Sequence, residues 1–455
     1  MVAGAVLIVQ KGTMSLSPPR PSREAIVAAD KARVWHPYTA MDKYVAEVDP
    51  LVITRAEGSR LFDVDGRSYL DANSSWWVAS LGHRHPRLIE TLKRQADELV
   101  FCSLAGTTHE HAALLAEEIL AIAPAGMARV FYSDDGSTAV EVALKLAVQF
   151  FAQTDRPQKT RFATLDSAFH GETVGASSVG GVPLFRQSFR SILFETILLP
   201  SPAGELGLEA AIVALHETFA REGHTLAGIV VEPLVQGAAG MQTYDPAYLR
   251  AVRQVCDEHD VLFIDDEVFA GYGRTGTFWA VEQAGVSPDL LCTAKGFSGG
   301  ILPMAATLAT ERVYDAFRGD ASRAFYYGHS YCGHPLGAAI AREVLRIYRE
   351  ERVIEGIAER HARIAKTFTQ LGRHPQIGRA RALGMIGACD LDVGKSGYLG
   401  DVGWQVYAEA RARGAYLRPL GNVIYVAPPL NIPLAELDTL LGIVRESVEA
   451  VVARG

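Results

Sequence analysis

The stretch RVFYSDDGSTAVEVALKLA, residues 129–147, changes from one regular pattern to another within a few residues. It opens with an apolar run typical of a β-strand. It ends with apolar residues at helical spacing, because Val140, Leu144 and the following Val148 share one face. A short polar loop containing Gly136 separates the two patterns. The stretch therefore predicts a strand that runs directly into a helix, as in α/β sheets.

The loop between this strand and helix has the features of an anion site. Gly136 permits close approach of the backbone to a ligand. The first amides of a helix have no partner within the helix and lie at the positive end of its dipole, and phosphate is the usual guest there. The simpler alternative is that Asp135 or Ser137 only caps the helix, since both residue types are preferred N-caps. The loop alone does not decide between the two.

Outward from this stretch, short apolar runs alternate with helical patterns from about residue 75 to about residue 308. The alternation predicts an α/β fold with a mostly parallel sheet covered by helices. The expected strands are residues 129–132, 161–165, 228–231, 262–264 and 290–293.

The flanking regions differ from this central part. Residues 55–71 have the pattern of a short antiparallel meander with a turn at Asp65-Gly66. Helical patterns dominate after Gly333, and strands are expected in GMIGACDLDV (384–393) and VIYVAPPLNI (423–432). The resulting division is a flexible leader at 1–22, an N-terminal segment of a small domain at 23–74, a large domain at 75–333 and a C-terminal small domain at 334–455.

Ionisable residues follow three of the expected strands. Glu232 ends AGIVVE, Asp266 follows VLFID, and Lys295 ends LLCTAK. Ligands of an open parallel sheet bind beyond the carboxyl ends of its strands. The three side chains are therefore expected in one crevice. Two of them also have a simpler explanation: Asp266 as a structural ion pair with an arginine such as Arg274, and Lys295 as a surface lysine.

A phosphate cradle, an aspartate and a desolvated lysine together are the parts that hold pyridoxal phosphate. Desolvation lowers the pKa of a lysine and makes its neutral amine available for a Schiff base. An aspartate keeps the pyridine nitrogen of the cofactor protonated, so that the ring acts as an electron sink. The combination is more specific than any member alone.

The bulk composition is that of a soluble globular protein of 455 residues, with 49% hydrophobic and 21% charged residues. The formal net charge of -8 makes nucleic acid a poor partner. The five cysteines are scattered and form no CxxC pair, which favours reduced thiols in the cytoplasm over disulfides or zinc. No apolar run approaches the roughly 18 residues that a membrane span requires. The apolar N-terminus is a poor signal peptide, and the sequence does not decide between Met1 and Met14 as the start.

The segment FIDDEVFAGYGRTG (263–276), followed by a Lys-Gly pair, resembles the class III aminotransferases. EPLVQGAAGM (232–241), FHGET (169–173) and Gly-His-Ser (328–330) extend the resemblance over nearly the whole chain. It implies the fold type I architecture of pyridoxal-phosphate enzymes. That fold has a large domain with a mostly parallel seven-stranded sheet, and a smaller α+β domain formed by both chain ends.

The resemblance also implies roles for individual residues. Lys295 would form the Schiff base and move protons, and Asp266 would pair with the pyridine nitrogen. The family's homodimer, with active sites shared between subunits, would place Ser330 on the phosphate of the neighbouring subunit. The remaining expected cofactor contacts are Gly136, Ser137 and Thr138 at the phosphate, Phe169 stacked on the ring, His170 beside it, and Glu232 and Gln236 at the ring edge.

Three further segments are similar to one branch of the family, the 7,8-diaminopelargonic acid synthases that aminate 8-amino-7-oxononanoate in biotin synthesis. These segments are WHPYTAM (35–41), SSWWVASLGHRHP (74–86) and LRPLGNVIYVAPPL (417–430). The expected substrate-binding residues are Tyr38, Trp76, Trp77, Phe169 and Tyr425, with Arg418 on the substrate carboxylate.

The amino donor is less directly specified. Aromatic walls suit the adenine and sulfonium of S-adenosylmethionine, which we expect as donor. Gly328-His329-Ser330-Tyr331 is more similar to synthases that use lysine, so lysine stays the alternative. Phe169 and Glu172 also depart from the tyrosine and aspartate of other synthases.

Other functions have weaker support. GKS at 394–396 lacks the first glycine of a phosphate loop, and Gly328–Cys332 lacks the last glycine of a nucleophile elbow. No metal is expected, because the histidine pairs have no further ligands at zinc-like spacing. The remaining alternatives are another ω-amino acid or diamine aminotransferase using pyruvate or 2-oxoglutarate, and a non-catalytic binding protein. The presence of both Lys295 and Asp266 argues against the second.

Overall fold

The computed structural model describes residues 20–393 and 397–454. Most of the leader expected at residues 1–22 lies outside the described residues, as does the GKS of residues 394–396. The chain forms two compact units. The first contains residues up to Arg55 together with Phe62–Arg67, and the second contains Ala56–Leu61 together with Ser68–Gly455. The domain limits expected from the sequence stay a prediction.

The N-terminal unit contains two helices that are joined through one carboxylate. Tyr44 donates its hydroxyl to Oδ2 of Asp30 at 2.6 Å, and the ring of His36 lies 3.0 Å from the same carboxylate. The helices are α1 (Arg23–Arg33) and α2 (Met41–Glu47).

Three short strands occupy the region expected to form a meander. β1 (Ile53–Glu57) and β2 (Arg60–Asp63) contain residues of both units, and β3 (Ser68–Asp71) belongs to the second. The backbone N–H of Asp63 donates to the carbonyl of Arg67 at 3.0 Å, which closes the expected turn.

A seven-stranded sheet forms the centre of the second unit, with the order β4-β12-β11-β10-β7-β5-β6. Strand β12 runs antiparallel to both of its neighbours, and all other pairs are parallel. The expectation of a mostly parallel seven-stranded sheet is confirmed. The strands are β4 (Met127–Ser133), β5 (Arg161–Leu165), β6 (Ile197–Leu199), β7 (Leu226–Val231), β10 (Leu262–Asp266), β11 (Leu290–Thr293) and β12 (Ala305–Thr310).

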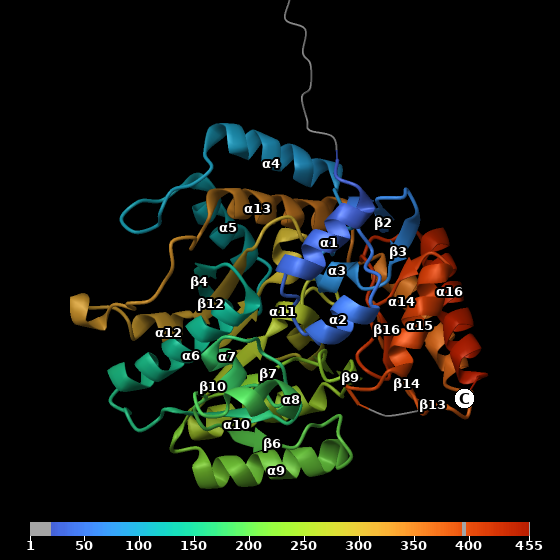
Figure 1. Ribbon diagram of the computed structural model, residues 1–455. Coiled ribbons are helices and arrows are strands. Elements are labelled where there is room, and N and C mark those ends of the chain that lie inside the picture. The colour runs from blue at the N-terminus through green and yellow to red at the C-terminus, as the bar shows by residue number, and fades with distance from the viewer. Residues whose placement is uncertain (1–19, 394–396, 455) are drawn as a thin grey trace, which may run out of the picture. The chain divides into compact units, whose positions relative to one another are not determined.

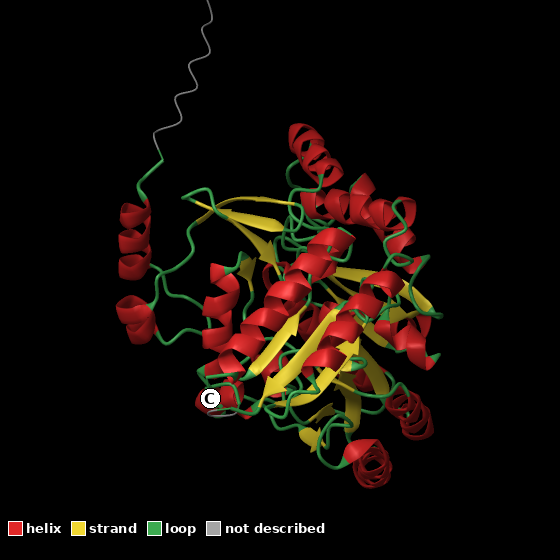
Figure 2. Ribbon diagram, turned by 90° about the vertical axis from the view of Figure 1, so that its right-hand side faces the viewer, coloured by secondary structure: helices red, strands yellow, loops and turns green. Residues whose placement is uncertain are grey.

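Both faces of this sheet are buried, as Figure 2 shows by the helices on either side of the strands. Along β10, Leu262 and Ile264 pack in one apolar cluster with α6, whereas Phe263 packs in a second cluster with α5 and α10. This explains why the strands appear in the sequence as continuous apolar runs.

The helices of this part are α3 (Ser74–Trp77), α4 (Pro86–Glu98), α5 (Glu110–Leu120), α6 (Gly136–Gln153), α7 (Val174–Ser178), α8 (Pro183–Arg186), α9 (Gly207–Glu222), α10 (Ala247–His259), α11 (Glu267–Ala270) and α12 (Glu311–Asp315). Short 3-10 helices are η1 (Gln187–Phe189), η2 (Ala280–Ala284), η3 (Lys295–Ser298) and η4 (Ala321–Arg323), and a small hairpin joins β8 (Val235–Gln236) to β9 (Gln242–Thr243).

The order of the sheet places the three ionisable residues on adjacent strands. Strands β7, β10 and β11 are neighbours, with Asp265 paired to Val231 and Asp266 paired to Cys292. Glu232 directly follows β7, Asp266 ends β10, and Lys295 comes two residues after β11. Because these strands are parallel and in register, their carboxyl ends meet at one edge of the sheet.

A smaller antiparallel sheet, β13-β14-β16, lies in the C-terminal part of the second unit. Its strands β14 and β16 confirm the strands expected in residues 384–393 and 423–432. Figure 1 shows α14, α15 and α16 grouped beside this sheet. The elements are α13 (Pro335–Glu350), α14 (Ile357–Leu371), β13 (Ile377–Leu383), β14 (Ile386–Leu391), α15 (Val402–Ala412), β15 (Ala415–Tyr416), β16 (Val423–Val426) and α16 (Leu434–Val452).

The described part of the chain shows neither a membrane-crossing helix nor a cluster of metal ligands. None of its helices combines the length and the apolar composition that a membrane crossing needs. Residues 20–393 and 397–454 also contain no group of three or more histidine, cysteine or acidic side chains arranged to hold a metal ion.

Two carboxyl groups at the end of β10 are buried away from water. Asp265 and Glu267 are both fully buried. Burial and the neighbouring carboxyls of Glu267 and Asp266 raise the pKa of Asp265 well above its usual range. Burial likewise raises the pKa of Glu267 to about 8, even though Glu267 accepts the N–H of Val281 at 2.9 Å. The buried position of Asp265 therefore favours its protonated, neutral form in the folded protein.

We expect Asp265→Asn to stabilise the protein at pH 8 relative to the unsubstituted chain, because asparagine resembles the protonated carboxyl in shape and polarity. The pKa of Asp265 is higher in the folded than in the unfolded state, so the stability of the unsubstituted protein falls as pH rises above about 4. The variant lacks this loss, which amounts to about 1.4 kcal/mol per pH unit at most. Melting temperatures at pH 5 and pH 8 test this, with the exposed Asp257→Asn as control. An equal effect of Asp265→Asn at both pH values would contradict the assignment.

Candidate active site

Lys295 lies deep in the protein with a partial opening to solvent. Its backbone has a left-handed φ of 48° at the first residue of η3. The Nζ atom lies 4.6 Å from the ring centre of Trp77 and 5.6 Å from that of Phe269. Burial lowers the pKa of Lys295 to about 8, against the opposing attraction of Asp266 and Glu232. A surface lysine, the simpler alternative, is therefore wrong.

Asp266 is a buried carboxylate with a buried imidazole as its partner. Its Oδ2 lies 2.7 Å from Nδ1 of His170, and its Oδ1 accepts the backbone N–H of Val268 at 3.1 Å. Arg274, the partner of the simpler ion-pair explanation, instead donates to the carbonyl of Pro428 at 2.7 Å. A buried carboxylate of this kind is suited to hold a further positive group, such as a protonated ring nitrogen.

Glu232 forms the third acidic group at this edge of the sheet. Its carboxylate accepts the backbone N–H groups of Phe169 at 2.9 Å and Gly237 at 3.0 Å. Burial nevertheless raises the pKa of Glu232 to about 7, so that it carries a proton for part of the time near neutrality. The ring of Phe169 is half-buried and lies 5.7 Å from Phe185.

Gln236 is buried, and its side-chain amide is hydrogen-bonded to other parts of the protein. Its Nε2 donates to the carbonyl of Asp166 at 2.8 Å, and Ser201 donates its hydroxyl to Oε1. The contact of Gln236 with a ring edge stays a prediction.

The start of α6 combines a helix cap with close backbone packing. Asp135 accepts the N–H of Thr138 at 2.8 Å, and the Thr138 hydroxyl accepts the N–H of Asp135 at 3.1 Å. The cap suggested by the sequence as the simpler alternative is therefore present. It occupies the hydroxyl of Thr138, whereas Ser137 Oγ accepts from the N–H of Glu172 at 3.1 Å. A Cβ at Gly136 would come within 2.6 Å of Val268, so only glycine allows this approach.

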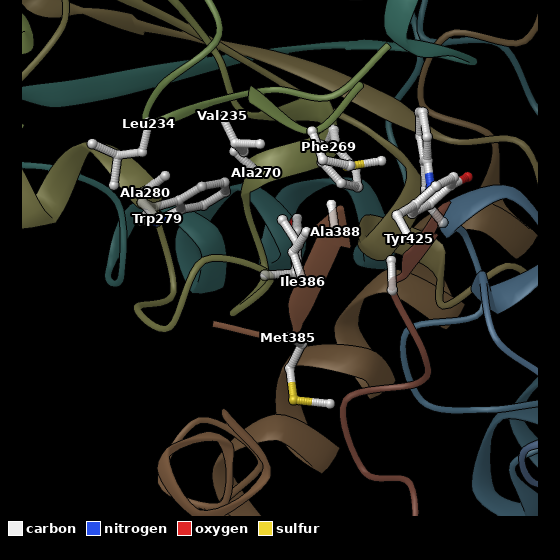
Figure 3. Packing of buried hydrophobic residues seen from close by; sticks show 14 of the residues in the cluster. Leu234, Val235, Phe269, Ala270, Trp279, Ala280, Met385, Ile386, Ala388 and Tyr425 are labelled. Atoms are coloured by element: carbon white, nitrogen blue, oxygen red, sulfur yellow. The ribbon is translucent and has the colours of Figure 1, made fainter. Parts of the chain in front are cut away.

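Aromatic side chains enclose the approach to Lys295. Trp77 donates its indole N–H to the hydroxyl of Tyr425 at 3.2 Å, and its ring lies 4.5 Å from Phe269. Figure 3 shows Phe269 and Tyr425 in the same buried cluster, with Ala388 and Ile386 of β14 near them. Phe269 was not expected from the sequence. The available signal was its position on α11, three residues after Asp266.

Trp76 differs from its neighbour in exposure and contacts. It is 40% exposed, and the guanidinium of Arg418 lies 4.2 Å from its ring centre. The pair therefore separates into Trp77 against Lys295 and Trp76 against Arg418. The roles of Trp76, Trp77 and Arg418 in substrate binding stay a prediction.

The two tryptophans sit in an unusual backbone turn. Four consecutive residues, Ser74, Ser75, Trp76 and Trp77, have φ values of 48°, 46°, 68° and 73°. Left-handed backbone costs roughly 1–2 kcal/mol for each residue with a Cβ. The rest of the fold must therefore stabilise this turn.

Three further residues complete the account of the site. Tyr38 belongs to the N-terminal unit, and its substrate contact stays a prediction. Ser330 is exposed. Tyr398, which the sequence did not suggest, lies 5.1 Å from Phe185 and extends the row of aromatic rings that begins at Phe169.

A family model and curated relatives match most of the chain. Residues 42–448 match the family model described as aminotransferase class-III. A protein of Nitratidesulfovibrio vulgaris named adenosylmethionine-8-amino-7-oxononanoate aminotransferase is 41% identical over 444 residues, which cover 94% of this chain and 82% of that protein. The protein of that name from Geobacter sulfurreducens is 39% identical, with 93% and 97% covered.

Solved structures of aminotransferases have a similar fold. The crystal structure of the adenosylmethionine-8-amino-7-oxononanoate aminotransferase from Methanocaldococcus jannaschii has a TM-score of 0.89 at 34% identity, covering 94% of this chain and 99% of that one. An ω-transaminase from Pseudomonas jessenii in complex with PMP has a TM-score of 0.88 at 27% identity, with 94% and 98% covered.

Proposed function

Because the chain belongs to the class III aminotransferases, we propose that it aminates 8-amino-7-oxononanoate to 7,8-diaminononanoate in biotin biosynthesis, with pyridoxal phosphate as cofactor. The observation that carries this proposal is the pair of adjacent tryptophans, Trp77 against Lys295 and Trp76 against Arg418, in a chain 41% identical to a relative named for that reaction. The five cysteines are free thiols, which suits a cytoplasmic enzyme.

The residues at the strand ends fit this cofactor. Lys295 would attach it, Asp266 would hold its ring nitrogen with support from His170, and Phe169 would cover its face. The backbone at Gly136 and Ser137 would hold the phosphate at the start of α6, because the helix cap leaves this end of the helix dipole available. Pyridoxal phosphate, when bound, supplies an electron sink for the carbon next to the transferred amine.

Lys295 is suited to accept and return a proton at Nζ. Lowering its pKa from 10.5 to about 8 corresponds to about 3 kcal/mol against the charged form. A cation–π contact with Trp77 contributes roughly 0.5–2 kcal/mol in the opposite direction. Desolvation therefore outweighs the ring contacts, and a useful fraction of neutral amine is present near pH 7–8.

The slot is suited to a keto acid with a long apolar chain. Trp77 and Tyr425 provide apolar walls near Lys295, and the guanidinium of Arg418 lies at the other end above Trp76. A guanidinium binds a carboxylate with two parallel hydrogen bonds. Trp76 limits the rotation of Arg418 and so keeps the guanidinium at a defined distance from the reacting amine.

The donor we propose is S-adenosylmethionine, with lysine as the alternative. The rings of Phe169, Phe185 and Tyr398 form a row beside the site, and aromatic faces attract both an adenine and a sulfonium. The names of the relatives from Nitratidesulfovibrio vulgaris and Geobacter sulfurreducens support the same donor.

We further propose a homodimer in which Ser330 of one subunit reaches the phosphate of the other. Ser330 is exposed, and next to it Tyr331 is 58% exposed. The ring of Tyr331 contacts that of Phe101, which is 42% exposed, at 5.7 Å. Aromatic side chains of this kind are enriched at protein interfaces.

We expect the cofactor-free protein to capture pyridoxal phosphate covalently at Lys295, at a rate that rises with pH and levels off above about 8. Only the neutral amine attacks the aldehyde, and an ordinary lysine would level off near 10.4. Borohydride reduction followed by peptide mapping identifies the labelled residue. Lys159 is an internal control, because burial also lowers its pKa to about 8, but its Nζ donates to the carbonyls of Gly223, His259 and Asp260. Label on Lys159 instead of Lys295 would refute the assignment, and Lys295→Ala should abolish both label and turnover.

We expect Arg418→Ala to weaken binding of the acceptor and to leave the reaction with the donor nearly unchanged. Loss of a charge-assisted carboxylate contact costs about 2–5 kcal/mol, which corresponds to a rise of about 30-fold or more in KM for 8-amino-7-oxononanoate. The half-reaction with donor should change by less than about threefold. Arg363→Ala, on α14, is the matched control. Equal loss in both half-reactions would rule out the carboxylate clamp, and failure of the unsubstituted enzyme to aminate this keto acid would favour another ω-amino acid substrate.

We expect S-adenosylmethionine to convert the bound cofactor to its aminated form in the absence of acceptor. The conversion is followed by absorbance after mixing the enzyme with S-adenosylmethionine or with lysine. Tyr398→Ala should slow the reaction with S-adenosylmethionine about tenfold or more, because stacking contacts are worth about 1–3 kcal/mol. Conversion by lysine alone would overturn the proposed donor and leave the acceptor and the cofactor unaffected.

A further inference from the structure

Two segments far apart in the sequence carry the residues of the acceptor slot. Trp76 and Trp77 follow β3, and Arg418 and Tyr425 lie on the segment from β15 to β16. The segments are paired along their backbones, with Tyr416 opposite Asp71 in the parallel pair β15–β3. Their relative position therefore sets the distance between the tryptophans and the guanidinium.

One buried side chain forms hydrogen bonds to two backbone positions of the segment from β15 to β16. Asn73 is 1% exposed. Its Oδ1 accepts the backbone N–H of Arg418 at 2.6 Å, and its Nδ2 donates to the backbone carbonyl of Tyr425 at 3.4 Å. One amide thus spans the two backbone positions that carry the proposed clamp and the proposed apolar wall.

Asn73 also precedes and anchors the left-handed turn. Its carbonyl accepts the N–H of Trp77 at 2.8 Å, and its own N–H donates to Oδ1 of Asp71 at 3.2 Å. The other oxygen of Asp71 accepts the Ser75 hydroxyl at 2.8 Å and lies 2.9 Å from the His83 ring. Asn73 therefore forms hydrogen bonds both to the turn that carries the two tryptophans and to the segment that carries Arg418 and Tyr425.

We propose that Asn73 is a positioning residue that sets the length of the acceptor slot, and so selects a keto acid by the distance from its carbonyl to its carboxylate. The inference rests on the proposed function for the identity of the acceptor. Asn73 bonds to the backbone of Arg418, Tyr425 and Trp77, so it acts through the side chains that these residues and Trp76 carry. Loss of its amide leaves an N–H and a carbonyl unsatisfied on the Arg418–Tyr425 segment, and this segment can then shift relative to the tryptophan turn.

The test compares Asn73→Ala with Asn431→Ala, a control that removes the Asn431 contact to the carbonyl of Leu81, which joins residues just beyond the same two segments. Asn73→Ala should raise KM for 8-amino-7-oxononanoate about tenfold or more, because small displacements of aligned groups are costly. The donor half-reaction should stay within about threefold, and Asn431→Ala should leave both parameters near their original values. Parallel loss of both half-reactions in Asn73→Ala, or an unchanged KM, would overturn the proposal.

A second variant and a binding measurement separate this proposal from the proposed function. Asn73→Asp keeps the acceptor for the N–H of Arg418 and removes only the donor to the carbonyl of Tyr425. It should therefore raise KM for 8-amino-7-oxononanoate, but less than Asn73→Ala does. It also serves as the test variant if Asn73→Ala does not fold. Binding of ω-amino monocarboxylates of increasing chain length, followed by tryptophan fluorescence, should show a sharp length preference in the unsubstituted protein and a broader one in either variant. An unchanged length preference refutes the role of Asn73. If the unsubstituted enzyme binds these acids but does not aminate the keto acid, the proposed acceptor is wrong and the length test still applies.

Discussion

Apolar packing on both faces of the central sheet is the constraint on which the site depends. Strands whose side chains are buried on both sides leave little room for polar groups except at their ends. Glu232, Asp266 and Lys295 occupy the ends of three adjacent parallel strands, and the in-register pairing of β7, β10 and β11 brings those ends to one edge. Asp265 shows the result of departing from this arrangement, because burial one residue earlier on the strand raises the pKa of this acid and favours its protonated form.

The electrostatics of the site follow from desolvation more than from pairing. Burial raises the pKa of Glu232 to about 7 and lowers that of Lys295 to about 8, although the two groups attract each other. Both groups can therefore exchange protons within the physiological range, as acid–base catalysis requires. Beside them, the carboxylate of Asp266 has a histidine ring and a backbone N–H as its partners.

The parts of the fold and site that depend on local pattern could be predicted from the sequence. Strands β5 and β11 have the expected limits, and Lys295, Asp266 and Glu232 were placed together because each follows a strand. Strand β6 was missed because it has only three residues, and β12 was missed because its antiparallel course leaves no local signal. Asn73 could not be identified, since its partners Arg418 and Tyr425 lie 345 and 352 residues further along the chain.

The left-handed turn Ser74–Trp77 has a consequence for how ligands are received. A backbone in this conformation is disfavoured in the unfolded chain, so the strain is introduced during folding and is present before any substrate arrives. The indole rings are then held in one arrangement by the Asp71 and Asn73 contacts. An incoming acid meets surfaces that lose little conformational entropy on contact, so more of the intrinsic interaction energy is retained as affinity.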